Sequence, residues 1–107
     1  MAGQVHEKQI VTSILKYLNS LPRCRAIKIH GSVFMQAGTP DIFGCIHVHH
    51  DDLHVGQMLC FEAKVPGNKP TPIQEHELKS WWECGAICAV VHSVDEVKHI
   101  LEANGLL

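Results

Sequence analysis

Two apolar runs joined by a short polar segment constrain the fold of this chain more than any other feature. The runs cover residues 41–49 and 57–64, and the polar segment between them, 50–56, reads HDDLHVG. A connection of this length cannot hold a crossover, which needs a dozen or more residues. The two runs are therefore predicted to pair as an antiparallel hairpin.

The charged residues of this hairpin gather where its apolar character ends. A turn centred on residues 52–53 places Lys64 opposite Asp41 and Glu62 opposite Phe43. Because side chains alternate between the faces of a strand, both carboxylates and the lysine then share one face. The two acids could hold one cation there. The alternative is a salt-bridged strand end, in which Lys64 pairs with one of the acids.

The rest of the chain alternates between helical and strand patterns. Helical periodicity and end signals predict helices at 5–18, 71–84 and 93–104. Apolar runs predict strands at 26–30, 41–49, 57–64 and 86–92, the last of them buried on both faces. Thr71 with Gln74, and Ser93 with Glu96, have the spacing of capping boxes. The expected fold is α/β, in the order α-β-β-β-α-β-α, with a mixed sheet flanked by helices.

The composition is that of one globular domain, residues 1–107. Hydrophobic residues make up 46% of the chain and charged residues 19%, which is enough for one core and argues against disorder. The net charge of −2, with histidines neutral, gives no sign of a nucleic-acid-binding surface spread over the whole molecule. The longest apolar run, 86–91, is too short to cross a bilayer, so no membrane partner and an intracellular location are expected.

The cysteines are odd in number, and three of them lie inside apolar strand-like runs. All five are predicted to be reduced core thiols rather than disulfides or metal ligands: Cys24, Cys45, Cys60, Cys84 and Cys88.

Glu7 is a charged residue on an apolar helix face. On a helical wheel it lies under Val11, Ile14 and Leu18. A carboxylate that faces the core is costly unless it is paired or binds a cation. The alternative is that Glu7 is stabilised by the helix dipole in the first turn and turns its side chain to solvent.

Gln74 raises a similar question in the helix that follows Pro72. It lies in the middle of the apolar side, which carries Leu78 and Trp81, with Trp82 near its edge. Gln74 either only completes the capping box with Thr71 or also contributes to a site, and the two roles are not exclusive.

Taken in order, these residues resemble the VRR-NUC family of the PD-(D/E)xK nuclease superfamily. The resemblance runs from Glu7 to about Leu101 and rests on Glu7, Gly38-Thr39-Pro40-Asp41, Glu62-Ala63-Lys64 and Gln74. It implies a restriction-endonuclease-like core that hydrolyses phosphodiester bonds with a divalent metal, Mg²⁺ or Mn²⁺.

The resemblance also implies a role for each residue of the site. The expected set is Glu7, Asp41, Glu62, Ala63, Lys64 and Gln74. The three carboxylates and the backbone carbonyl of Ala63 would be metal ligands, and Lys64 would be the catalytic lysine. Gln74 would complete the site from its helix.

Stand-alone members of this family are similar to archaeal-type Holliday junction resolvases, which act as dimers on branched DNA. The resemblance therefore implies a structure-selective endonuclease of DNA repair or recombination, in the cytoplasm of a bacterial or phage-infected cell. The expected partners are branched DNA, above all a four-way junction, and a second copy of the chain. Trp82 is a candidate for the dimer surface, unless the chain's own final helix covers it.

Two other function classes remain open from the sequence. One is a DNA-binding protein that keeps the nuclease fold without activity, although the complete acid-acid-lysine set speaks against it. The other is a zinc- or nickel-binding module built from His47, His49, His50 and His54. His47 and His49 are two residues apart on one strand face, which is a workable ligand spacing.

Overall fold

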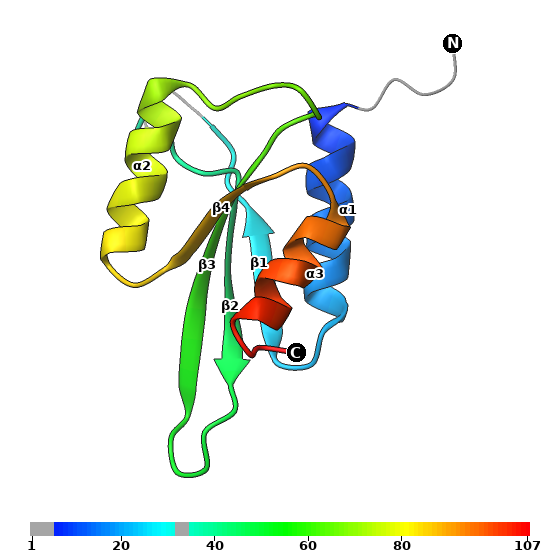
Figure 1. The fold of residues 1–107 in the computed structure, drawn as a ribbon, viewed down its shortest axis with the longest axis vertical. Helices are drawn as coiled ribbons and strands as arrows, with labels where there is room; N and C mark the ends of the chain where they lie inside the picture. The colour runs from blue at the N-terminus through cyan, green and yellow to red at the C-terminus, as the bar shows by residue number, and fades with distance from the viewer. Residues whose placement is uncertain (1–5, 32–34) are drawn as a thin grey trace.

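The computed structural model describes residues 6–31 and 35–107, which form helices around one four-stranded sheet (Figure 1). The elements are α1 (Glu7–Ser20), β1 (Cys24–Lys28), β2 (Ile42–Val48), β3 (Val55–Ala63), α2 (Pro72–Glu83), β4 (Ile87–Val91) and α3 (Val94–Ala103). This order confirms the predicted α/β fold. No helix within the described ranges is both long and apolar enough to span a membrane.

The sheet is mixed, as the sequence predicts. Its strand order is β1-β2-β3-β4, in which the first three strands are antiparallel and β4 runs parallel to β3. Helices α1 and α3 pack together on one face, and α2 lies on the other (Figure 1). The parallel pair needs a crossover, and α2 supplies it.

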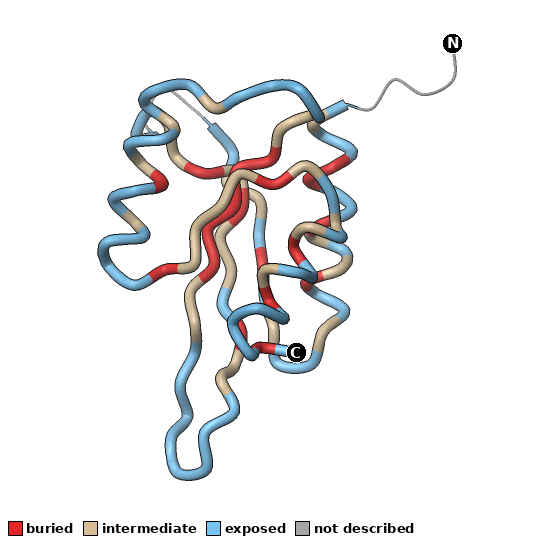
Figure 2. Tube along the Cα trace, in the orientation of Figure 1, coloured by how far each residue is buried: buried red, intermediate tan, exposed pale blue. Residues whose placement is uncertain are grey.

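The main core lies between the sheet and the pair α1 and α3. It is built from buried side chains of both helices and of every strand: Ile10, Val11, Ile14, Leu18, Ala26, Ile42, Ile46, Leu59, Phe61, Ala63, Val91, Val97, Leu101 and Leu106. On the opposite face, Phe43 contacts Trp81 of α2 edge to face at 4.9 Å between ring centroids. Figure 2 shows the buried segments meeting at the centre of the sheet, while the β2–β3 hairpin extends away from them.

Strand β1 begins two residues earlier than predicted. The backbone N–H of His47 donates to the Arg23 carbonyl at 2.9 Å. Hydrogen bonding to β2 therefore starts one residue before β1 itself. The Asn19 side chain binds both the N–H and the C=O of Ala26, each at 2.9 Å, and occupies the free edge of the strand. The first helix ends two residues later than predicted, at Ser20, while Val5 lies outside the described residues.

The hairpin register differs from the prediction by two residues. Ile42 pairs with Phe61, which places Asp41 opposite Glu62 instead of opposite Lys64. The cause is that β3 starts inside the segment predicted as a loop, where Val55 pairs with Val48. A shift of two residues keeps every side chain on its face, because the side-chain period of a strand is two.

The prediction that the fourth strand is buried on both faces is wrong. β4 is the last strand of the sheet, and its first four residues are only partly buried. The prediction of core thiols is likewise wrong for Cys45 and Cys84, which are exposed, whereas Cys60 is buried. Cys45 lies on the same face of β2 as Phe43, beyond the part of that face that α2 covers. All five cysteines are free.

The first capping box forms as predicted, but the second does not. Thr71 Oγ1 accepts from the backbone of Gln74, and Gln74 Oε1 accepts from the backbone of Thr71. At α3, Ser93 caps Glu96 in the same way, yet the Glu96 carboxylate binds the backbone and ring of His92 instead of the Ser93 backbone.

Candidate active site

Asp41 and Glu62 meet at one end of the antiparallel pair β2 and β3. The backbone N–H of Asp41 donates to Glu62 Oε2 at 3.3 Å, and the backbone N–H of Ala63 donates to Asp41 Oδ2 at 3.0 Å. The Asp41 carbonyl also accepts from Ile29 at 2.7 Å, which ties this corner to β1. Backbone hydrogen bonds therefore fix the position of both carboxylates.

Glu62 is a buried acid beside a second acid. Only 1% of its surface is exposed. Burial raises its pKa from 4.5 to about 8, contact with the Asp41 carboxyl adds to the rise, and the charge of Lys64 opposes it. A buried charged carboxylate is unfavourable without a positive partner. This pair is consequently suited to hold a cation.

Lys64 follows directly after β3. Its backbone N–H donates to the Val91 carbonyl at 3.0 Å, which continues the β3–β4 ladder by one residue and keeps the alternation of faces. The lysine is half-buried on the face of Glu62, and its charge acts on that carboxyl. The ion pairs found among residues 6–31 and 35–107 do not include Lys64, so the salt-bridged strand end is not formed.

The loop before Asp41 packs against the first turn of α2. Gly38 has φ +80°, and a Cβ at this position would lie 2.7 Å from the carbonyl oxygen of Ile73 and 3.2 Å from the backbone nitrogen of Gln74. This contact brings the capping box close to the loop that carries Asp41. The sequence contains Gly38 as part of the motif but gives no sign of this packing.

Gln74 and Glu7 begin the two helices near this end of the sheet. Gln74 is half-buried and its Oε1 is used by the cap, which leaves the amide nitrogen for other contacts. Glu7 is half-buried in the first turn of α1. In Figure 1 the starts of α1, β2 and α2 and the end of β3 all lie toward the same end of the molecule.

The described side chains bring together two carboxylates, and no group of three His, Cys, Asp or Glu residues among them is arranged to hold a metal ion. The predicted roles of Glu7 and of the Ala63 carbonyl as further metal ligands therefore stay predictions. The donor set of Asp41 and Glu62 still fits Mg²⁺ or Mn²⁺, since both prefer oxygen ligands and Mg²⁺ usually keeps several waters.

The histidines of the hairpin lie close together at the other end of β2. The ring of His47 is 5.8 Å from that of His49 and 5.2 Å from that of His54. Burial and the charge of Arg23 lower the pKa of His47, and its Nδ1 is buried without a hydrogen-bond partner among the described residues. Among the described residues no group of three metal-binding side chains is arranged around these rings, so the structure does not support the metal-binding module.

Trp82 lies on the outer side of α2, with 62% of its surface exposed. The alternative that the final helix covers it is wrong. Its neighbour Trp81 turns inward instead and packs on Phe43.

The sequence matches no protein-family model and none of the curated proteins compared with it. Its fold, however, is found in solved structures. A structure described as "VRR_NUC domain" is 23% identical and superposes with a TM-score of 0.67, covering 90% of this chain and 94% of that one. A second, described as "VRR_NUC domain protein", is 18% identical with a TM-score of 0.64, covering 92% of this chain and 86% of the other. The chain therefore has the fold of VRR_NUC domains, as the resemblance of its motifs predicts.

Proposed function

We propose that the protein is a Mg²⁺- or Mn²⁺-dependent endonuclease that hydrolyses phosphodiester bonds in branched DNA. The observation that carries the proposal is the buried Glu62 carboxyl held opposite Asp41, with Lys64 two residues further along the same strand face. The likeness to VRR_NUC domains supports it.

Asp41 and Glu62 would bind the metal, with the carbonyl of Ala63 and the carboxylate of Glu7 as further ligands. A bound divalent ion supplies positive charge to the attacked phosphate and lowers the pKa of a coordinated water. The backbone hydrogen bonds from Asp41 and Ala63 hold the two carboxylates in place before DNA arrives. Little reorganisation is then needed at the moment of reaction.

Lys64 acts on the same phosphate from beside Glu62. Its half-buried ammonium group orients the attacking water and offsets the negative charge that develops on the phosphate oxygens. Gln74 supports the loop of Asp41 from the first turn of α2, where its amide nitrogen is free to contact the substrate.

A four-way junction is the proposed substrate, cut by a homodimer. A domain of 107 residues with one such site makes one cut. Resolving a junction takes two symmetric cuts, and a two-fold dimer presents two identical sites to a substrate of matching symmetry.

The test is a cleavage assay on four-way, flap, nicked and linear DNA, with Mg²⁺, Mn²⁺ or chelator. The wild type is expected to cut branched DNA only with metal. Asp41→Ala and Glu62→Ala lose both cleavage and Mn²⁺ binding in calorimetry, whereas Lys64→Ala loses cleavage but still binds Mn²⁺. Glu102→Ala, at an exposed acid on α3, is the control and keeps both.

DNA that is bound but never cut, with any metal, would favour the inactive DNA-binding protein instead. Calorimetry in which Asp41→Ala binds Mn²⁺ like the wild type would remove Asp41 from the ligand set.

A further inference from the structure

One face of β1 and β2 carries cationic and histidine side chains away from the candidate active site. Alternation along β2 places Asp41, Phe43, Cys45 and His47 on the same face. That face is open beyond Phe43, because α2 covers β3, β4 and Phe43, and Cys45 is exposed.

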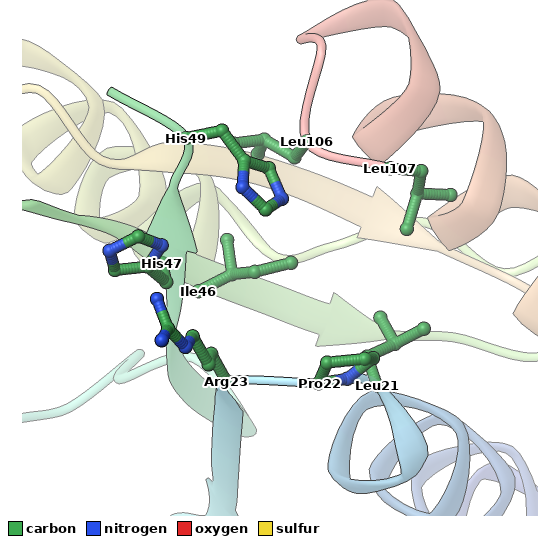
Figure 3. A pocket seen from close by; sticks show the side chains of 8 residues that line it. All are labelled: Leu21, Pro22, Arg23, Ile46, His47, His49, Leu106 and Leu107. Carbon is green, nitrogen blue, oxygen red and sulfur yellow. The ribbon is translucent and has the colours of Figure 1, made fainter. Parts of the chain in front are cut away.

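Two arginines of the neighbouring segment lie on this face. Arg25 pairs with Cys45 and is exposed, and the Arg23 carbonyl accepts from the backbone of His47, two residues further along. Figure 3 shows the Arg23 side chain pointing toward the His47 ring. Among the residues that the structure covers, no ion pair of either arginine is found.

No acid interrupts this face between the candidate active site and the hairpin turn. The β2 and β3 positions that share it are Phe43, Cys45, His47, Gly56, Met58 and Cys60, and His54 lines the same hollow as Arg23, Cys45 and His47. Asp51 and Asp52 lie beyond these positions, at the turn itself. In a chain of net charge −2, two arginines on a face without an intervening acid make a local electropositive surface.

The length of this surface suits a DNA duplex. Six steps of extended chain from Asp41 to His47 span about 20 Å. B-DNA rises about 3.4 Å per base pair, so this distance corresponds to about 6 base pairs. A duplex arm cut at Asp41 and Glu62 would therefore reach the histidine cluster within one helical turn.

We infer that this surface, formed by Arg23, Arg25, His47 and His54 and called here the basic track, binds the phosphate backbone of one duplex arm of the DNA substrate. The inference rests on the proposed function. The two guanidinium groups contact phosphates by charge, and the histidine rings add hydrogen bonds near the end of the arm.

The test measures binding of a fluorescent duplex of about 20 base pairs, two turns of B-DNA, in chelator so that no cleavage occurs. The variant Arg23→Gln/Arg25→Gln removes both charges at similar side-chain size. It is expected to bind about tenfold more weakly at low salt, and the slope of log Kd against log salt should fall by about 2.

Two controls separate charge loss from other effects. Lys8→Gln/Lys16→Gln removes two exposed charges from α1, on the opposite side of the sheet, and should bind like the wild type. Arg23→Lys/Arg25→Lys keeps the charge and should restore most of the affinity and the salt slope. Circular dichroism and thermal melting show whether each variant is folded.

The basic track is overturned if the arginine-to-glutamine and the lysine-to-glutamine double variants weaken duplex binding equally, or if neither weakens it. If that happens while the wild type still cuts DNA with metal, the proposed function stands without it. A wild type that neither binds nor cuts any DNA overturns both.

Discussion

Glu62 is a candidate metal ligand whose burial opposes the stability of the fold. Glu62 is almost fully buried, its carboxyl lies beside that of Asp41, and its pKa is raised to about 8. A core position normally excludes such a group. Local strain or unfavourable burial is typical of positions that serve chemistry.

We expect Glu62→Gln to stabilise the metal-free protein by roughly 1–3 kcal/mol, because it removes a buried acid yet keeps an oxygen to accept from Asp41. The same change should abolish Mn²⁺ binding and cleavage. Urea unfolding in chelator measures the free energy of unfolding. Glu83→Gln, at an exposed site, is the control and should change it little. A variant less stable than the wild type would show that the carboxylate supports the fold.

At the scale of elements, the start of α2 and the loop before β2 behave as one unit. Gly38 approaches the Ile73 carbonyl too closely for any side chain, and the capping box of Thr71 and Gln74 fixes the same turn of helix. The loop in turn positions Asp41. A change in this packing should therefore alter the position of Asp41, a proposed metal ligand.

Gly38→Ala is expected to destabilise the protein by about 2–3 kcal/mol, since it adds a clash with Ile73 to the strain of a left-handed residue. Gly67→Ala is the matched control. Gly67 has φ +92°, but a methyl group added there would meet nothing within 4 Å, so only the strain of about 1 kcal/mol should appear. Thermal and urea unfolding compare the two, and equal losses would show that the contact with Ile73 contributes nothing.

For the whole molecule, the exposed side of α2 is the surface on which the proposed dimer depends. Trp82 stands on this side, and β4 next to it is an edge strand with partly buried residues. Exposed aromatic residues are enriched at protein interfaces. The candidate active site lies at the start of α2, whereas Trp82 lies near the end of this helix.

Light scattering of the wild type at micromolar concentration is expected to give about twice the chain mass of 11.9 kDa. Trp82→Glu should shift the mass toward one chain and turn paired junction cuts into single nicks. Leu53→Glu, an exposed apolar residue at the hairpin turn, is the control and should stay dimeric. A wild-type mass of one chain together with undiminished paired cutting contradicts the dimer.

The sequence by itself determined the order of the elements and the face shared by Asp41, Glu62 and Lys64. Caps, helical periodicity and strand alternation are local signals, and they act between residues close in the chain. The shared face even survived an error of two residues in the hairpin register, because the strand period is two.

Only the tertiary structure decided the register, the exposure of Cys45 and β4, and the contact of Gly38 with α2. Each depends on how the strands and helices pack against one another, and on how much of a sheet face a helix covers. Such contacts join residues far apart in the chain, so no local pattern encodes them. The basic track is of the same kind: its arginines and histidines come from separate segments, which pairing of β1 with β2 places side by side.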